Sequence, residues 1–307
     1  MNIVIFGAGA LGSFFGGMLA KQHTVALLGR EQHITMVRHH GLKISGKTRR
    51  MIHLEAVLSL KEVSFPPDLI IITVKSYDTF NAAQELSVHL NKECLLLTLQ
   101  NGLGNIEVLT SYFPKQHILA GVTTQGVFYK KPGWVVHTGF GTTLIGDLSG
   151  ETTDRVDELA RVFSESGIPT VVSNHIYSEI WKKAIINASI NPLTAFLRCK
   201  NGYLLKNPII ENVVEHICLE AAAVAKAEQI NVDFKELLVL TKQVLQKTKN
   251  NYSSMVQSIQ RGKQTEINEI NQKFVEYGRR HGIETPLNTF MVSLIKNTPD
   301  YLNIRKR

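Results

Sequence analysis

Three polar side chains are regularly spaced within an otherwise apolar stretch of the chain. Lys183, Asn187 and Asn191 lie four residues apart, and most of the residues between them are apolar. In an α-helix this spacing turns by only about 40° per step, so the three side chains line one side. An amine and two amides on an apolar helix must face water or a polar ligand. A lysine that reaches solvent and amides that bind nearby backbone would also explain the pattern.

Further polar residues follow between two predicted helices. Either Asn251 or Ser253 can cap the second helix, which leaves Ser254 in its first turn. Hydroxyl and backbone N–H groups at a helix start can hold a carboxylate, although capping alone is the simpler explanation. Glu266 lies beside an apolar stripe in a predicted helix over 264–281. We expect Glu266 to turn inward toward a cation such as a lysine, the alternative being a solvated side chain.

A glycine-rich loop near the start of the chain indicates a second kind of chemistry. An apolar strand at 2–6 leads into Gly7-Ala8-Gly9-Ala10-Leu11-Gly12, followed by a helix and a strand at 24–28. In this context the motif is typical of dinucleotide binding rather than of a glycine turn without a ligand. Gly7 permits the tight turn, Gly9 lets the backbone approach a pyrophosphate, and Gly12 allows close helix packing. The helix N-terminus then attracts the anion.

The residues after the second strand favour NADPH over NADH. NAD-binding proteins usually carry an acidic residue at this point, whereas this strand ends Leu28-Gly29-Arg30-Glu31. Arg30 can pair with a 2′-phosphate through two parallel hydrogen bonds, and Gly29 leaves room for it. Glu31 would favour NAD if the register moved by one residue.

The order of predicted elements indicates an α/β N-terminal domain of the Rossmann type over residues 1–174. Buried strands at 68–75, 94–99 and 117–122 alternate with helices. Lys75 and Asn101 stand at the carboxyl ends of two of them, where open α/β sheets bind ligands, although both could be solvated loop residues. A hairpin at 126–137, a strand at 142–147, a helix at 150–166 and a strand at 168–173 complete this domain.

Residues 175–307 show helical patterns only and predict an all-α C-terminal domain. The predicted helices cover 176–198, 207–229, 233–249, 252–260, 264–281 and 287–296. The first of them carries Lys183 and follows the α/β domain directly, so we expect it to border both domains.

Composition narrows the class of protein. The chain has 307 residues, of which 44% are hydrophobic and 20% charged, and its formal net charge is +8. The basic residues are scattered without a nucleic-acid-binding motif, so a basic field that attracts anionic small molecules is the better interpretation. Three cysteines without ligand spacing indicate reduced thiols in a cytoplasmic protein, with no metal site. No apolar run is long enough to span a membrane.

Together these positions resemble the ketopantoate reductase (2-dehydropantoate 2-reductase) family over essentially the whole chain. The matching residues are Gly7 to Gly12, Arg30, Lys75, Gln100-Asn101-Gly102, Trp181, Lys183, Asn187, Asn191-Pro192, Asn251, Ser254 and Thr265-Glu266. The resemblance implies a Rossmann domain followed by a helical domain like that of 6-phosphogluconate dehydrogenase. One departure is Thr123-Thr124-Gln125, where family members often have histidine as the third residue.

The resemblance also implies a role for each position. Lys183 would be the catalytic proton donor to the ketone oxygen, and Glu266 its acidic partner. The substrate-binding positions would be Asn101, Asn187, Asn191, Asn251 and Ser254. The cofactor-binding positions would be Gly7, Ala8, Gly9, Ala10, Leu11, Gly12, Arg30, Lys75, Asn101 and Glu266.

The implied activity is NADPH-dependent reduction of 2-dehydropantoate to (R)-pantoate, for pantothenate and coenzyme A biosynthesis. Hydride addition builds negative charge on the ketone oxygen, which an ammonium both stabilises and protonates. The alternatives are a reductase of another branched 2-keto acid and a non-catalytic NADPH sensor with the same fold. The helical domain is a candidate for homodimer formation, although the sequence indicates no interface residues.

Overall fold

The computed structural model describes residues 1–89 and 93–298, and its contacts divide the chain into two compact units. The first unit comprises Met1–Gln100 and Asn105–Ile176. The second comprises Asn101–Gly104 together with the chain from Tyr177 onward. The sequence did not predict that the short segment Asn101–Gly104 would group with the helical part. Leu90 and the basic tail at 305–307 lie outside the described residues.

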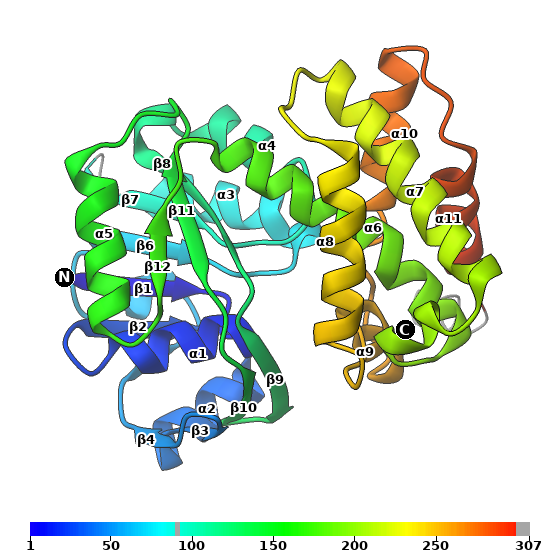
Figure 1. The fold of residues 1–307 in the computed structure, drawn as a ribbon. Helices are drawn as coiled ribbons and strands as arrows, with labels where there is room; N and C mark the ends of the chain where they lie inside the picture. The colour runs from blue at the N-terminus through cyan, green and yellow to red at the C-terminus, as the bar shows by residue number, and fades with distance from the viewer. Residues whose placement is uncertain (90–92, 299–307) are drawn as a thin grey trace. The chain divides into compact units, whose positions relative to one another are not determined.

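The first unit is built on an eight-stranded sheet, labelled in Figure 1. Its strands, in order across the sheet, are β12 (Thr170–Val172), β11 (Thr143–Asp147), β8 (Ile118–Thr123), β7 (Leu95–Thr98), β6 (Leu69–Ile72), β1 (Asn2–Phe6), β2 (Thr24–Leu28) and β5 (Glu55–Val57). Neighbouring strands are parallel except for the antiparallel pair of β8 and β11. The predicted Rossmann-type α/β domain is therefore confirmed.

Alternating side chains of each strand cover opposite faces of this sheet, because successive residues of a strand point to opposite sides. Ile3 and Ile5 of β1 pack with α1 (Ala10–Leu19), α2 (Glu31–His40) and α5 (Asp154–Glu165). Val4 and Phe6 pack on the other face with α3 (Thr79–His89) and α4 (Asn105–Tyr112). The sheet is thus buried on both faces, which explains why its strands read as continuous apolar runs.

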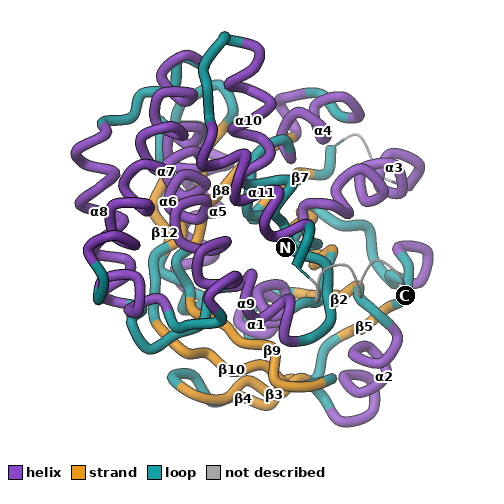
Figure 2. The backbone as a smooth tube through the Cα atoms, turned by 90° about the vertical axis from the view of Figure 1, so that its right-hand side faces the viewer, coloured by secondary structure: helices purple, strands orange, loops and turns teal. Residues whose placement is uncertain are grey.

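A second, four-stranded sheet has the order β4 (Arg50–Ile52), β3 (Leu42–Gly46), β10 (Trp134–Gly139) and β9 (Gly126–Lys131), side by side in Figure 2. The predicted hairpin is confirmed: β9 and β10 are antiparallel and joined at Gly133, whose φ is +72°. The sequence did not predict α2, β3, β4, β5 or α4.

Buried His33 joins α1 and α2 to this second sheet. Its Nδ1 accepts a hydrogen bond from the Gly133 N–H at 3.1 Å and lies 3.1 Å from the Tyr129 hydroxyl. Its Nε2 lies 3.0 Å from the hydroxyl of Ser13. Burial lowers the pKa of His33 to about 4, so the ring is neutral near neutral pH and serves as a structural link.

The second unit is drawn in Figure 2 as helices and loops. Its helices are α6 (Ile176–Leu197), α7 (Pro208–Ala227), α8 (Phe234–Lys247), α9 (Ser254–Gln260), α10 (Asn271–Arg280) and α11 (Pro286–Lys296). Short 3-10 turns in the described part of the chain occupy Leu60–Glu62, Ser76–Asp78, Lys115–His117 and Asn201–Leu205. No strand occurs in this unit up to residue 298, the last one described, so the predicted all-α domain is confirmed over that range.

Several predicted bounds were wrong. The helix predicted over 264–281 begins only at Asn271, and residues 265–270 form turns, so Glu266 precedes the helix. The strand predicted over 68–75 ends at Ile72, which places Lys75 in the following loop. The helix predicted over 150–166 begins at Asp154. Each error lies where polar or turn-forming residues adjoin an apolar run, and element ends are the part of a sequence pattern least tied to the backbone hydrogen bonds.

The apolar stripe around Glu266 packs against α6. Phe274 and Tyr277 of α10 contact the ring of Trp181, edge-on at 5.7 Å and stacked at 5.4 Å between ring centroids. Ile267 and Ile270 are also buried, at 0% and 2% exposure. The core of the second unit therefore holds α6 and α10 together, which positions the residues that they carry.

Two findings concern the chain as a whole. Cys94, Cys199 and Cys218 are all free thiols. Among the described residues, none of the helices combines the length and the apolar character that crossing a membrane requires.

Candidate functional site

The glycine loop between β1 and α1 has the geometry of a phosphate-binding turn. Gly7 has a φ of +114°, and a side chain there would approach Val74 N to 2.5 Å. A side chain at Gly12 would collide with the Gly7 carbonyl and with Ile5. At Gly9, by contrast, an added Cβ would meet one atom within 4 Å, the Gly7 carbonyl oxygen at 4.0 Å. The fold therefore requires glycine at positions 7 and 12, whereas Gly9 leaves space beside the backbone for a ligand.

Arg30 and Glu31 lie where β2 ends and α2 begins. Arg30 is the exposed N-cap residue of α2, and Glu31 is the exposed acid in the helix's first turn. Glu31 is therefore explained by the helix dipole, which favours negative charge at this end. Gly29 packs beside the loop, since an added Cβ would lie 2.7 Å from the Ala8 Cβ. Arg30 therefore follows directly on a residue that packs against the glycine loop.

A buried polar network joins the loops that follow β6 and β7. The side-chain amide of Gln100 donates to the Val74 carbonyl at 3.1 Å and to the Thr79 hydroxyl at 2.8 Å. The Thr79 hydroxyl lies 2.7 Å from the Asn105 side-chain oxygen. Half-buried Lys75 lies within the first of these loops. Lys75 follows Val74 of this network, in the loop at the carboxyl end of β6.

The tip after β7 makes its contacts with the helical unit. The backbone N–H of Leu103 donates to the Glu269 carbonyl at 2.8 Å. Gly102 lies so close to that carbonyl that an added Cβ would be 2.5 Å from its oxygen. Asn101, predicted to contact both substrate and cofactor, is half-buried at the start of this segment. The backbone of residues 101–104 is therefore anchored on the segment that carries Glu266.

Lys182 and Lys183 have different surroundings on α6. The Lys182 amine pairs with Glu179 at 3.5 Å and with Glu236 at 3.4 Å. The Lys183 amine instead experiences the charge of Glu266. The prediction that Lys183 rather than Lys182 faces the polar site is consistent with this arrangement.

The pKa of Lys183 is strongly shifted. Its side chain is partly exposed overall, yet desolvation by burial around its amine lowers the pKa to about 8, and the Glu266 carboxylate opposes this shift. Glu266 itself is only 6% exposed, so the expected inward orientation is correct and the solvated alternative is excluded. A lysine whose pKa lies near neutrality, beside a buried carboxylate, is suited to proton transfer.

The two asparagines of the predicted polar face continue along α6 from Lys183. Asn187 is half-buried and Asn191 is 5% exposed. One turn beyond Asn191, the Thr194 hydroxyl donates to the Ser253 hydroxyl at 2.8 Å. Ser253 caps α9 by accepting from the Val256 N–H at 3.3 Å, which settles the choice of cap residue.

Ser254 and Asn251 flank this cap. Ser254 is exposed in the first turn of α9, as predicted. Asn251 is exposed too, and its backbone carbonyl accepts from the Asn201 N–H at 3.0 Å. Both side chains are accessible, and the Thr194–Ser253 bond joins the start of α9 to α6. This bond thus places the start of α9, which carries Ser254, against the part of α6 just beyond Asn191.

The sequence did not single out Glu269 or Asn271 of the same segment. Burial and the nearby charge of Glu266 raise the pKa of Glu269 to about 7, while Lys273 and Lys296 act in the opposite direction. Asn271 is fully buried, and its amide donates to the Ala188 carbonyl of α6 at 3.1 Å. The only signal for these two residues in the sequence is that each is a polar side chain on the buried side of the apolar stripe.

Comparison with known proteins decides the family. The model for "Ketopantoate reductase PanE/ApbA" matches residues 3–150, and that for its C-terminal domain matches residues 175–298. The 2-dehydropantoate 2-reductase of Pyrococcus abyssi is 37% identical over 96% of this chain and 97% of its own. That of Halobacterium salinarum is also 37% identical, over 96% of this chain and 98% of its own.

The chain belongs to the ketopantoate reductase family.

Solved structures of two relatives share the whole fold. A PanE/ApbA family ketopantoate reductase from Ralstonia eutropha has a TM-score of 0.90 and 31% identity, covering 100% of this chain and 99% of its own. A D-mandelate dehydrogenase in ternary complex with NADH and anilino(oxo)acetate has a TM-score of 0.93 and 29% identity. That match covers 99% of this chain and 100% of the dehydrogenase. The family is one of oxidoreductases, and its structural relatives include a protein that binds NADH.

Gln125, which departs from the family pattern, has a structural role. Its amide nitrogen donates to the Gly141 carbonyl at 2.6 Å, and its side-chain oxygen accepts from the Gly141 N–H at 3.2 Å. The same oxygen lies 3.2 Å from His137 Nε2. Gln125 therefore fastens the loop that follows β10, which explains a buried polar residue at this point of a family member.

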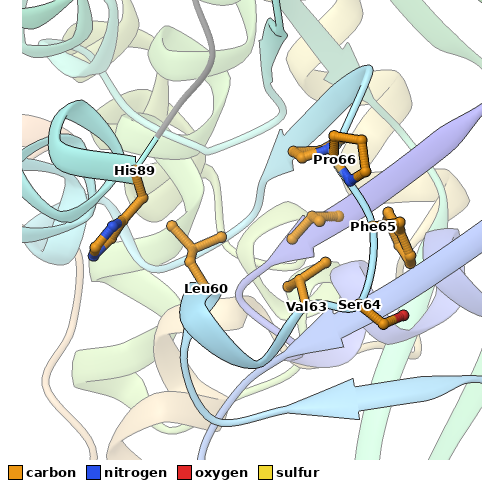
Figure 3. A pocket seen from close by; sticks show the side chains of 8 residues that line it. Leu60, Val63, Ser64, Phe65, Pro66 and His89 are labelled. Atoms are coloured by element: carbon orange, nitrogen blue, oxygen red, sulfur yellow. The ribbon is translucent and has the colours of Figure 1, made fainter.

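Among the residues that the structure describes, no group of three histidine, cysteine or acidic side chains could hold a metal ion. A pocket of about 390 Å³ is lined mainly by the segment that connects β5 to β6, and Figure 3 shows Leu60 and Val63 between His89 and Pro66. Its lining is mainly apolar and contains none of the predicted site residues.

Proposed function

We propose that this chain catalyses NADPH-dependent reduction of 2-dehydropantoate to (R)-pantoate, with Lys183 as the proton donor. The single observation that carries the proposal is the Lys183–Glu266 pair: a lysine with a pKa of about 8 beside a carboxylate that is 6% exposed. Membership of a family of oxidoreductases whose members include 2-dehydropantoate 2-reductases supports the proposal. In this role the chain would supply pantoate for pantothenate and coenzyme A biosynthesis.

In the proposed reaction, Lys183 acts at the ketone oxygen. When bound, the dinucleotide supplies the hydride that is added to C2 of the keto acid. The ammonium of Lys183 stabilises the negative charge that develops on the oxygen and transfers its proton there. Because the lysine must be protonated for this step, the carboxylate of Glu266 favours the active form. The oxygen becomes the hydroxyl of the product.

Other residues of the helical unit would orient the substrate. Asn187 and Asn191 present amides along the Lys183 side of α6, where they can bind the hydroxyl and carbonyl groups of a keto acid. Ser254 and Asn251 supply accessible polar side chains for the carboxylate. Asn101 would contribute from the anchored segment after β7. These assignments rest on residue chemistry and on the family.

The α/β unit would hold the dinucleotide. The open space at Gly9 and the free N–H groups that begin α1 suit a pyrophosphate. Arg30 at the end of β2 suits a 2′-phosphate, and Lys75 adds positive charge at the carboxyl end of the sheet. Gly7, Ala8, Ala10, Leu11 and Gly12 complete the loop, and Glu266 remains a predicted contact.

A second candidate function follows from the D-mandelate dehydrogenase structures. Two of them, both containing NADH, share the fold with TM-scores of 0.93 and 0.90. The same lysine chemistry would serve an NADH-dependent reductase of another branched or aromatic 2-keto acid, because the proton donor acts on the ketone and not on the substrate's tail. Arg30 favours NADPH against this alternative.

An oxidation assay tests the proposal and its rival together. The purified protein is mixed with NADPH or NADH and with ketopantoate, 2-oxoisovalerate or phenylglyoxylate, and the loss of absorbance of the reduced cofactor is followed. We expect the highest kcat/KM for ketopantoate with NADPH. A higher kcat/KM for phenylglyoxylate with NADH would replace this proposal by the second candidate. No turnover with any pair would leave the non-catalytic sensor.

Location and assembly complete the proposal. Three free cysteines support a reducing compartment, which we take to be the cytoplasm. A homodimer through the helical domain would show as twice the chain's mass of 34.3 kDa in light scattering, whereas a monomer would show that mass itself.

A further inference from the structure

A proline interrupts the hydrogen bonding of the helix that carries Lys183. Helix α6 continues from Ile176 to Leu197 with Pro192 inside it. Proline has no N–H, so the carbonyl four residues earlier, that of Ala188, loses its usual helical donor. Ala188 is 0% exposed, and a buried carbonyl without a donor is costly. This carbonyl requires a donor from elsewhere.

Asn271, the first residue of α10, supplies that donor. Its side-chain nitrogen lies 3.1 Å from the Ala188 carbonyl oxygen. The same nitrogen also donates to the side-chain oxygen of Asn288 at 3.0 Å. Asn271 and Asn288 are both 0% exposed, so these bonds lie in the interior of the helical unit.

The orientation of both amides follows from a carboxylate at the far end of the network. Glu220 of α7 accepts from the backbone N–H groups of Leu287 at 2.8 Å and Asn288 at 2.9 Å. The side-chain nitrogen of Asn288 donates to Glu220 as well, at 2.9 Å. Because a carboxylate only accepts, this nitrogen must face Glu220, which turns the Asn288 oxygen toward Asn271. The nitrogen of Asn271 is thereby directed to Ala188.

The Asn271–Ala188 bond joins the two segments on which the reducing site depends. Asn271 directly follows the turn of Glu266, whose carbonyl accepts from the Ile270 N–H at 3.0 Å. Ala188 adjoins Asn187 and lies little more than one helical turn beyond Lys183. A shift at this bond would change the separation of Lys183 and Glu266.

We propose that Asn271 is a positioning residue for the reducing site: its amide replaces the N–H that Pro192 lacks and so holds the Lys183 helix against the Glu266 segment. Asn271 acts through Ala188 and has no contact with the reacting atoms in this proposal. Its catalytic consequence rests on the proposed function, whereas the structural link does not.

A double-mutant cycle with Pro192 tests the link. Asn271→Ala removes the donor, and Pro192→Ala supplies an N–H that can bond to the Ala188 carbonyl within the helix. We expect Asn271→Ala alone to lower the urea midpoint of unfolding and to reduce kcat for ketopantoate about tenfold or more, with an unchanged dissociation constant for NADPH. In the Pro192→Ala background, the same substitution should produce only about half or less of each effect, because the carbonyl keeps a donor.

Asn201→Ala is the matched control in the stability cycle. Asn201 is 7% exposed, and its amide donates to the Thr248 hydroxyl at 2.9 Å, away from α6. Its effect on the urea midpoint should add to that of Pro192→Ala without coupling. If Asn271→Ala alone does not fold, the double variant should recover folded protein.

The outcomes separate this inference from the proposed function. Additive effects of Asn271→Ala and Pro192→Ala on both readouts, or a double variant that still fails to fold, would overturn the link. Coupling in the urea midpoint without coupling in kcat would leave Asn271 structural and overturn its positioning role. An inactive wild-type protein would contradict the proposed function before any variant is compared, whereas the urea cycle would still test the link.

Discussion

The Glu266 carboxylate acts electrostatically on the Lys183 amine within the helical unit. Burial lowers the pKa of Lys183 to about 8, and the negative charge of Glu266 raises it again. The pair connects the middle of α6 with the turn before α10, two segments far apart in the sequence. Its chemical consequence is an amine that changes protonation close to neutral pH.

The pH dependence of the reaction should therefore follow Lys183. Ketone reduction requires the protonated amine, so kcat should fall as the pH rises through about 8. Oxidation of the hydroxy acid requires the neutral amine, so its kcat should rise over the same range. Glu266→Gln removes the charge that raises the pKa of Lys183, and the high-pH limb for reduction should move to lower pH. Steady-state kinetics with saturating substrates measure both limbs. A limb that stays in place in this variant would contradict the pairing.

Glu269 should make the stability of the protein depend on pH. Its pKa is raised from 4.5 to about 7 in the folded protein, by burial first and by Glu266 next. A raised pKa means that the folded state favours the protonated carboxyl, so this contribution to stability is complete below about pH 4.5 and lost as the pH rises through about 7. Glu269→Gln should thus gain about 1–3 kcal/mol in free energy of unfolding at pH 8 relative to pH 5.

Urea unfolding of wild type and variant at both pH values measures this difference. The matched control is Glu276→Gln, whose carboxylate pairs with Lys273 at 2.8 Å and is 39% exposed. The control should show no such gain. An equal change for Glu269→Gln at pH 5 and pH 8 would mean that the carboxyl is solvated.

The glycine loop offers a pair of substitutions with opposite expectations. At Gly9 an added methyl group meets protein only at 4.0 Å, so Gly9→Ala should keep the melting temperature but obstruct the dinucleotide. At Gly12 the methyl group would approach Ile5 to 2.9 Å and collide with the loop carbonyl, so Gly12→Ala should lower the melting temperature. Calorimetry and fluorescence titration with NADPH separate the effects. Unchanged NADPH affinity in Gly9→Ala would place the pyrophosphate elsewhere.

Arg30 should determine the choice between the two dinucleotides. Arg30→Ala removes the charged partner of the 2′-phosphate, so the dissociation constant for NADPH should rise about 10- to 100-fold, with little change for NADH. Glu31→Ala is the control. Glu31 occupies the first turn of α2, so its removal should leave the ratio of the dissociation constants for NADPH and NADH unchanged. Equal weakening of both cofactors by Arg30→Ala would show that Arg30 does not contact the 2′-phosphate.

Local pattern sufficed for the parts of the fold with strong periodicity. Apolar runs and glycine positions were enough to predict the first strand, glycine loop, helix and second strand of the chain. They were also enough to predict the hairpin around Gly133. Helix α6 was predicted within a residue of its observed end, because its mostly apolar run of 22 residues is too long for a strand. Lys183 could be preferred to Lys182 from helical geometry alone.

The features that could not be predicted from the sequence depend on contacts between residues that are far apart in the chain. The turns at 265–270 carry buried Ile267 and Ile270 in a helix-like spacing, yet the regular helix begins only at Asn271. The Gln272 N–H donates to the Ile267 carbonyl at 3.1 Å, five residues back rather than the four of an α-helix. The Leu103–Glu269 backbone bond joins residues from different parts of the chain, so no local pattern indicates it. The role of Asn271 likewise depends on a proline about eighty residues earlier in the chain.

The most direct test of the central claim is the rate of ketopantoate reduction by Lys183→Ala at pH 7, beside wild type and Lys182→Ala. Lys182 pairs with Glu179 and Glu236, so its loss should leave kcat nearly unchanged. Lys183→Ala should lower kcat by about 10²- to 10⁴-fold while it binds NADPH as tightly as wild type. A normal kcat in Lys183→Ala would contradict the assignment of Lys183 as the proton donor.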